Sequence, residues 1–230
     1  MPNDQFFKLD NPAWYSLAET HRHFAINKPG IKRYRQDIVS FLAFDHSKPE
    51  ALYLLDQLAA PDESFFIIGN LPPLPANYSI VTQLPCEQMI CSELINTPTA
   101  TATIEKLDDA NEAQMLSLIN LVQPGYFLPG TRLMGDYVGI RHNGELVAMA
   151  GERMKMSGLT EISAVVTHPA FTGRQYAQQL VAHIVRKNIE AGIIPFLHVA
   201  ATNERAIAIY KKLGFDRRRI IDFWKIKREK

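Results

Sequence analysis

The sequence is poor in cysteine, with only Cys86 and Cys91 among 230 residues. No histidine or further cysteine lies close to either of them, and their spacing matches no zinc or redox motif. We therefore expect two reduced thiols, without a disulfide or a metal site. Long apolar runs are also missing. The longest fall far short of the roughly 18 residues that would span a bilayer, so no membrane span is predicted.

A marked excess of charge of either sign is absent as well. The 25 Lys and Arg residues against 24 Asp and Glu residues give a formal net charge of +1, which exerts no general attraction on nucleic acid or on an anionic membrane. The first residues, MPNDQFFKLDNPAW, lack the basic stretch, apolar run and cleavage site of an export signal. We expect a cytoplasmic protein whose partners include neither nucleic acid nor membrane.

The amino-acid composition is that of a globular protein. Hydrophobic residues make up 47% of it and charged residues 21%, which is near the average for such proteins. Its length suits one large domain or two small ones. Small, polar and β-branched residues with one proline fill positions 93–103 and indicate a break. We divide the chain there into an N-terminal α/β region, residues 1–100, and a second domain, residues 101–230.

The N-terminal region shows elements but no chemistry. Asp10 or Asn11 can cap a helix that has Pro12 in its first turn and runs to about residue 24, and a second helix is expected over residues 49–60. Strand-like runs cover residues 36–44, 64–70 and 78–84. The region has no cluster of histidine, cysteine and carboxylates and no nucleophile motif, so its role stays unassigned.

The second domain alternates between strand and helix signals. Residues 109–112 have the form of a capping box before a helix that ends near Val122. Asn143-Gly144 is suited to the tight turn of a hairpin between two strand-like runs. The order over residues 103–230 is strand, helix, hairpin, strand, helix, strand, helix, strand. The fold class predicted is therefore α/β, with a mixed sheet.

One turn in this domain is suited to an anion. The strand that ends in Val166-Thr-His-Pro leads through Gly173 into a helix with apolar residues at helical spacing. Free backbone N–H groups and the positive end of a helix dipole favour phosphate at such a point. An ordinary connection between a strand and a helix has the same sequence pattern, so the turn by itself is only weak evidence for a phosphate site.

Two motifs resemble the GNAT superfamily of acyl-CoA-dependent N-acetyltransferases, in a branch where an additional N-terminal region precedes the transferase domain. Residues 203–215, NERAIAIYKKLGF, match the family pattern N-x-x-A-x-x-x-Y-x-x-x-G-F at all five fixed positions. In the pyrophosphate loop Gly173 and Ala177 match the family, whereas Thr172 and Gln175 depart from it. The resemblance covers about residues 103–230 and implies a GNAT-like fold.

The resemblance also implies roles for single residues. Tyr210 would protonate the leaving CoA thiolate, and Glu161 would accept the proton of the acceptor amine, with Glu152 and His198 in reserve. Asn203 would contact the cofactor. The cofactor-binding set is Val165, Val166, Thr167, Thr172, Gly173, Arg174, Gln175, Tyr176, Ala177, Asn203 and Tyr210. We expect Gln175 to have a negative φ in the first turn of the helix, where its amide can donate to a phosphate oxygen.

Each of these residues also has a purely structural interpretation. Tyr210 can be a core residue, Asn203 a helix cap and Glu161 a solvated carboxylate at a strand edge. His168 is interpreted as a turn residue and His198 as a packed strand residue. The basic tail, residues 215–230, invites a nucleic-acid interpretation, but its apolar residues Ile220, Ile221, Phe223, Trp224 and Ile226 favour a sheet strand with a charged outer face.

The sequence thus predicts an N-acetyltransferase that moves an acetyl group from acetyl-CoA to a primary amine by direct attack on the thioester, without a metal. Residues 123–132, with Tyr126 and Phe127, fall where the family shapes its acceptor pocket. The acceptor, a small molecule or a peptide, stays open, as does the choice between monomer and homodimer. The rival interpretation is a non-catalytic acyl-CoA-binding module whose pyrophosphate loop has degenerated.

Overall fold

The computed structural model describes residues 5–230, which divide into two compact units. The first four residues, on which part of the expectation about an export signal rests, lie outside the described residues. Unit 1 holds the residues up to Cys86 together with Ile220–Lys230, and unit 2 is Glu87–Arg219. Strands β5 (Tyr78–Ile90) and β11 (Asp216–Arg228) have residues in both. The polar stretch at residues 93–103 lies within unit 2, and no sequence signal indicated that the end of the chain belongs with unit 1.

Unit 1 is built around a small mixed sheet. Its strands are β1 (Ala25–Lys28), β2 (Ile31–Tyr34), β3 (Phe41–Phe44) and β4 (Ser64–Ile68), followed in the sheet by β11. The β3–β4 pair is parallel, whereas β1–β2, β2–β3 and β4–β11 are antiparallel. Helix α1 (Pro12–Ala18) and the 3-10 segments η1 (Phe7–Asp10), η2 (Arg22–Phe24) and η3 (Pro49–Gln57) complete it.

Two expectations for unit 1 were wrong in detail. The first helix ends at Ala18, because the backbone N–H of His21 turns back to the carbonyl of Ser16 and the chain continues as η2. The segment expected as a second α-helix has 3-10 geometry. The β1–β2 hairpin was missed, although Gly30, with φ +75°, marks its turn in the sequence as Pro29-Gly30.

Unit 2 carries a larger mixed sheet in the order β5-β10-β9-β8-β7-β6. The strands after β5 are β6 (Glu105–Leu107), β7 (Tyr137–His142), β8 (Glu145–Met156), β9 (Leu159–Thr167) and β10 (Ile194–Ala200). β6 to β9 pair antiparallel and β10 is parallel to β9. The mixed α/β sheet predicted from the sequence is confirmed.

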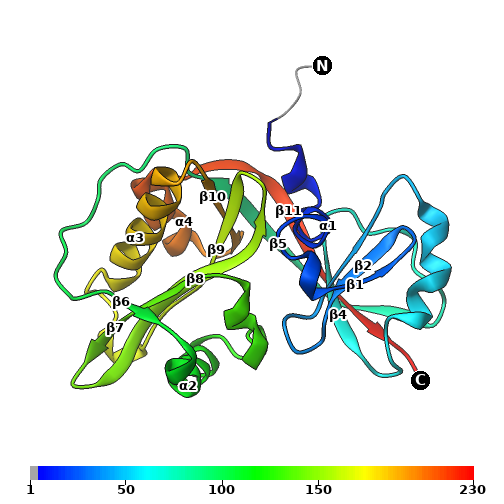
Figure 1. Ribbon diagram of the computed structural model, residues 1–230, viewed down its shortest axis with the longest axis horizontal. Helices are drawn as coiled ribbons and strands as arrows, with labels where there is room; N and C mark the ends of the chain where they lie inside the picture. Colours follow the sequence, from blue (N-terminus) through cyan, green and yellow to red (C-terminus); the bar gives the residue numbers. More distant parts are fainter. Residues whose placement is uncertain (1–4) are drawn as a thin grey trace. The chain divides into compact units, whose positions relative to one another are not determined.

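Helices lie on both faces of the unit 2 sheet. α3 (Tyr176–Glu190) and α4 (Glu204–Leu213) cover one face and α2 (Glu112–Val122) covers the other (Figure 1). Short 3-10 segments η4 (Asp109–Asn111), η5 (Pro129–Met134) and η6 (Pro169–Phe171) join the elements. Each face has its own apolar cluster: Ile162, Leu180, Leu197 and Ile207 belong to the α3/α4 face, and Leu118, Tyr137, Met149 and Val166 to the α2 face.

Local signals account for most of these elements. Asn143 (φ +50°) and Gly144 (φ +84°) form the expected hairpin turn between β7 and β8. The capping box lies one residue earlier than predicted. Asp108 accepts a hydrogen bond from the Ala110 N–H at 3.0 Å, and Asn111 accepts one from the Asp108 N–H at 2.8 Å.

The basic tail is a strand, as its apolar residues predicted. Ile221, Phe223 and Ile226 of β11 are buried, and residues 223–227 pair with β4. Over the described residues, no helix is long and apolar enough to cross a membrane.

Candidate active site

Strands β9 and β10 separate part-way along their length. Their parallel pairing runs from Leu159 with Ile194 to Ile162 with Leu197. Beyond this last pair, both strands continue for several residues, to Thr167 and to Ala200. We call the opening between residues 163–167 and 198–200 the fork. Because unpaired strand edges present N–H and C=O groups, the fork offers backbone hydrogen bonds to a ligand.

A β-bulge in β9 lies at the start of the fork. The register with β8 shifts between the pairs Met149–Val166 and Gly151–Ser163, which leaves Ala164 and Val165 opposite the single residue Ala150. Ala164 has φ +52°, a left-handed conformation that costs an L-residue about 1–2 kcal/mol. The bulge turns Ala164 toward the α2 face and Val165 toward the α3/α4 face. The strand edge that carries the predicted cofactor-binding residues Val165, Val166 and Thr167 thus begins at this bulge.

The loop expected to hold phosphate leads from η6 into α3. Residues 172–175 are exposed, and α3 begins at Tyr176, so the first N–H groups of a 15-residue helix lie at the end of the loop. Arg174 lies over the ring of Phe171, 5.0 Å from its centroid. The candidate cofactor residues from Thr172 to Ala177 are therefore together at one helix N-terminus, where an anion is stabilised.

The expectation for Gln175 was wrong. This residue occupies the N-cap position of α3 with φ +59° and ψ +19°, a left-handed conformation, and not the first helical turn. Gly173, with φ +81°, is left-handed as well, so a left-handed residue lies on each side of Arg174 before the helix starts. Glycine takes this conformation freely, whereas glutamine takes it at a cost.

A hollow of about 390 Å³ lies beside the loop. Its lining comes from the start of α3, the end of α4 and the segment before β6: Asn96, Pro98, Gln175, Gln178, Ile209, Lys212 and Leu213. Lys212 is the charged member of this set, and no carboxylate belongs to it. The hollow therefore suits a negatively charged group.

Asn203 and Tyr210 both lie on α4. The side chain of Asn203 accepts a hydrogen bond from the Ala206 N–H at 3.1 Å, which confirms the helix cap. Tyr210 is partly buried against the α3/α4 cluster and packs on Phe215 with ring centroids 5.7 Å apart. Burial raises the pKa of Tyr210 to about 12, so its phenol keeps its proton at neutral pH.

Glu161 is fully buried, so the solvated-edge interpretation was wrong. Arg153 of β8 donates to both of its carboxylate oxygens, at 2.6 and 2.8 Å, and His198 Nδ1 lies 2.7 Å from Oε1. Burial by itself would raise the pKa of this carboxyl. The charge and hydrogen bonds of Arg153, with the hydrogen bond from His198, outweigh burial and lower the pKa to about 2.

The two reserve candidates are also enclosed. The side chain of His198 is 2% exposed and lies between Glu161 and Gln88 of β5. Glu152 is buried and holds Lys155 at 2.8 Å and Asn188 at 3.0 Å. His168 is a turn residue as interpreted, because its Nδ1 accepts from the Ala170 N–H at 3.2 Å.

Sequence reasoning missed Arg153, Gln88 and Arg218, which join Glu161 and His198 in one polar chain. Their signal is weak in the sequence, because each lies on a different strand and becomes a neighbour only through the sheet order. A polar residue at a position that strand alternation makes inward-facing is the one available clue.

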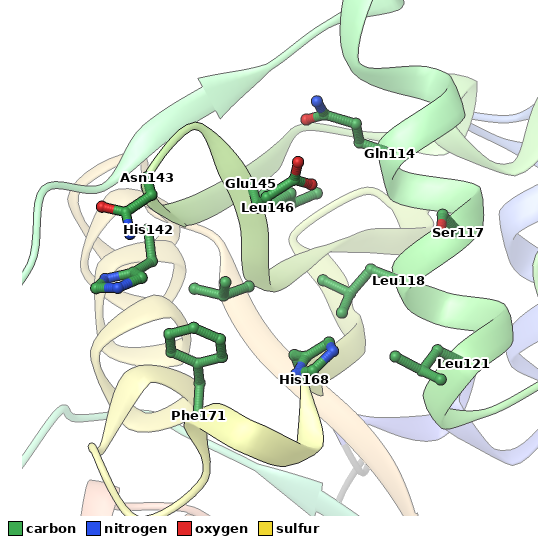
Figure 2. Close-up of a pocket in the computed structure, with 11 residues that line it drawn as sticks. Gln114, Ser117, Leu118, Leu121, His142, Asn143, Glu145, Leu146, His168 and Phe171 are labelled. Carbon is green, nitrogen blue, oxygen red and sulfur yellow. The ribbon is translucent and has the colours of Figure 1, made fainter.

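A second hollow, of about 410 Å³, lies on the α2 face of the sheet (Figure 2). α2 contributes Leu118 and Leu121 on one side, the end of β7 contributes His142 on the other, and His168 and Phe171 close the lower end (Figure 2). Phe171 contacts the rings of His142 and His168, with centroids 5.0 and 5.7 Å away. Arg174 lies over the same Phe171 ring, so this hollow adjoins the phosphate loop.

The segment expected to shape an acceptor pocket, residues 123–132, has one exposed and one buried aromatic residue. Tyr126 is 41% exposed, whereas Phe127 is buried against Tyr137 with ring centroids 5.6 Å apart. Tyr126 is thus the aromatic of the pair that another molecule can reach. In the part of the chain that is described, no group of three or more His, Cys, Asp or Glu residues has the arrangement of a metal site.

Comparison with known proteins gives consistent matches. The model of the family described as FR47-like protein matches residues 137–224. N-alpha-acetyltransferase RimI from Mycobacterium tuberculosis is 31% identical over 86 residues, which are 35% of this chain and 52% of that protein. The chain thus spans about half the length of this curated relative.

Solved structures match over nearly the whole chain. A crystal structure from Novosphingobium aromaticivorans, assigned to the acetyltransferases of the GNAT family, has a TM-score of 0.88 and 28% identity, covering 96% of this chain and 99% of its own. A GCN5-related N-acetyltransferase from Kribbella flavida shares the fold, with a TM-score of 0.64, 18% identity and 93% of each chain covered. With the motif at residues 203–215, these matches show that the chain is similar in sequence and in fold to acetyltransferases of the GNAT superfamily.

Proposed function

We propose that the protein transfers an acetyl group from acetyl-CoA to a primary amine by direct attack of the amine on the thioester. One observation carries the proposal: the fork between β9 and β10 opens toward the same end of β9 as the loop at residues 172–177. A long thioester cofactor can then place its pyrophosphate on the loop and its acyl end in the fork.

Several groups support binding of the donor. Backbone N–H groups of residues 173–177 and the start of α3 face the phosphates in this proposal, with Arg174 and Lys212 adding positive charge. Val165, Val166 and Thr167 offer the strand edge to the pantetheine arm, and an N–H group there polarises the thioester carbonyl. Thr167 Oγ1 is one of two buried side-chain oxygens in the described chain without a hydrogen-bond partner. A polar ligand in the fork would supply one.

Tyr210 is the proposed acid. A CoA thiolate has a pKa near that of a free thiol, about 8.5, and leaves most easily when it is protonated as the C–S bond breaks. A phenol whose pKa is held at about 12 by burial is protonated throughout the pH range of interest, so it is ready to donate. Asn203 lies one helical turn before Ile207 and two turns before Tyr210, on the same helix.

Glu161 is proposed to position the site and not to accept the proton itself. A carboxylate with a pKa of about 2 is a poor base near pH 7, because an effective base titrates close to the working pH. Arg153 and His198 already use its oxygens. The amine proton then leaves to solvent, as the amine enters the fork from the α2 face, on which Ala164 lies.

Calorimetry with acetyl-CoA and CoA tests the proposal. Binding of both with dissociation constants below millimolar is expected; binding of neither would end the proposal. Thiol release with a panel of amines then separates an enzyme from a non-catalytic binding module. The name of the relative, N-alpha-acetyltransferase, recommends peptides with free α-amines for the first panel.

Two variants test the assigned roles. Tyr210→Phe removes the phenolic proton and should lower kcat with little change in KM for acetyl-CoA. In Glu161→Gln the acid limb of the rate profile should keep its position if Glu161 only positions the site. Loss of that limb, together with turnover slowed by about two orders of magnitude or more, would instead identify Glu161 as the base.

A further inference from the structure

Five side chains from five neighbouring strands form one hydrogen-bonded row, which includes His198 at the start of the fork. Arg153 on β8 binds Glu161 on β9, and Glu161 binds His198 on β10. His198 Nε2 lies 3.0 Å from Gln88 Nε2 on β5, and Arg218 on β11 donates to Gln88 Oε1 at 2.9 Å. Glu161 and Gln88 are both 0% exposed and the His198 side chain is 2% exposed, so the middle of the row is shielded from water, whereas the arginines at its two ends are partly buried.

The direction of every hydrogen bond in this row follows from its end at Arg218. A guanidinium group has only donors, so the group of Gln88 that faces Arg218 is the carbonyl oxygen. The other end of the amide is then an NH₂ donor, and it faces His198 Nε2. An imidazole nitrogen that accepts a hydrogen bond carries no proton, so the proton of His198 is on Nδ1 and points at Glu161.

A second proton on His198 has no place in this arrangement. An Nε2–H group would face the NH₂ group of Gln88, and turning the amide over would place the NH₂ group against the Arg218 guanidinium. Either change places two donors against each other at the buried Gln88 side chain, where a buried polar group that loses its hydrogen bond costs about 1–3 kcal/mol. The hydrogen bonds of Gln88 and Arg218 therefore determine the charge of His198, although neither residue contacts Glu161 in this row.

We propose that Gln88 is a positioning residue of the transferase site, which holds His198 neutral with its proton on Nδ1 and so fixes the His198–Glu161 pair at the fork. His198 is the first residue of β10 after the last pair with β9. Gln88 precedes residue 101 and lies outside residues 137–224, which match the family model. A residue from the N-terminal part of the chain thus completes the site.

Nitrogen NMR of the histidine side chains at pH 7 tests the proton position directly and does not depend on the proposed function. In the wild-type protein, His198, assigned by comparison with His198→Phe, should show a protonated Nδ1 and an unprotonated Nε2. Gln88→Glu replaces the NH₂ donor by an acceptor and should convert His198 to the imidazolium. A wild-type His198 with its proton on Nε2, or a Gln88→Glu spectrum like that of the wild type, would overturn the proposal.

Kinetics test the consequence for catalysis, which rests on the proposed function. Gln88→Leu keeps the size of the side chain but removes the donor, so it also serves if Gln88→Glu does not fold. Both variants should lower kcat by about fivefold or more with KM for acetyl-CoA within about twofold, as expected for a displaced positioning group. On the acid side of the pH profile, the slope of log kcat/KM for the acceptor should rise from one to two. The reason is that His198 can now take up a proton as well.

Gln83→Leu is the matched control, since Gln83 is an exposed glutamine on the same strand. It should leave both kcat and the acid limb unchanged. An altered His198 spectrum in the Gln88 variants with unchanged kcat and unchanged slope would refute the positioning role. Absence of thiol release from the wild-type protein would refute the proposed function, and the spectra would still decide the proton position.

Discussion

Replacing Glu161 by glutamine removes the charge of the most enclosed carboxylate in the site. The ordinary pKa of a glutamate side chain is 4.5, and Arg153 and His198 lower that of Glu161 to about 2 in the folded protein, against the opposing effect of burial. This difference corresponds to about 3 kcal/mol of stability at neutral pH. Because the side chain is fully buried, solvent does not weaken the interaction in the way that it weakens a surface pair. Glu161→Gln should therefore lower the free energy of unfolding by about 3 kcal/mol at pH 7.

The sign of the pH dependence follows from the lowered pKa. The stabilisation is complete above about pH 4.5, where Glu161 is ionised in both the folded and the unfolded chain. It is lost as the pH falls toward 2, because the unfolded chain then binds a proton that the folded protein does not. Glutamine binds no proton in either state, so the difference between wild type and variant should shrink as the solution becomes more acidic.

Urea unfolding at pH 7 and at several values down to pH 3 measures both effects. Glu145→Gln is the control, since Glu145 is an exposed glutamate on the neighbouring strand β8. The control should change stability by less than about 0.5 kcal/mol. If Glu161→Gln costs less than about 1 kcal/mol at pH 7, or if its cost is the same at pH 3, the strong pairing of Glu161 with Arg153 is refuted.

Three further predictions concern single residues. Gln175→Gly should raise the free energy of unfolding by up to about 1 kcal/mol, because glycine relieves the strain at φ +59°, and should change acetyl-CoA affinity in calorimetry by less than tenfold; a loss of stability would contradict the strain. Gly214→Ala should cost more than about 2 kcal/mol in urea unfolding, since its Cβ would lie 2.2 Å from the Glu93 carbonyl oxygen at φ +104°. Burial raises the pKa of Cys91 to about 11, so iodoacetamide at pH 8 should label it only after unfolding; rapid labelling of the native protein would exclude this burial.

The parts of the site that depend on local structure could be predicted from the sequence. Asn203 caps α4 and Gly214 ends it with a left-handed residue, as their positions in the motif indicated. The hairpin turn at Asn143-Gly144 is equally local, since two residues with positive φ suffice for it. These features follow from the conformational preferences of the residues concerned and of their immediate neighbours.

Gln175 and Glu161 show where that reasoning failed. The backbone of Gln175 is left-handed because the chain must leave η6 and enter α3 within a few residues, and this geometry outweighs the preference of glutamine. The environment of Glu161 depends on which strands lie beside β9. Its partner Arg153 comes from the antiparallel neighbour and His198 from the parallel one, and the order of strands in a mixed sheet is not written in the pattern of any single strand.

Because β5 lies beside β10, it limits where a recombinant fragment of this chain can begin. A recombinant fragment of residues 101–230 contains both family motifs, yet it lacks the strand that pairs with β10. In the fragment, β10 would become an unpaired edge strand. Its free N–H and C=O groups would be a template for association between copies. Such a fragment would also lack Gln88. Soluble expression and a correctly formed site should therefore require a starting point before Tyr78, so the smallest working unit is longer than the region that carries the recognisable motifs.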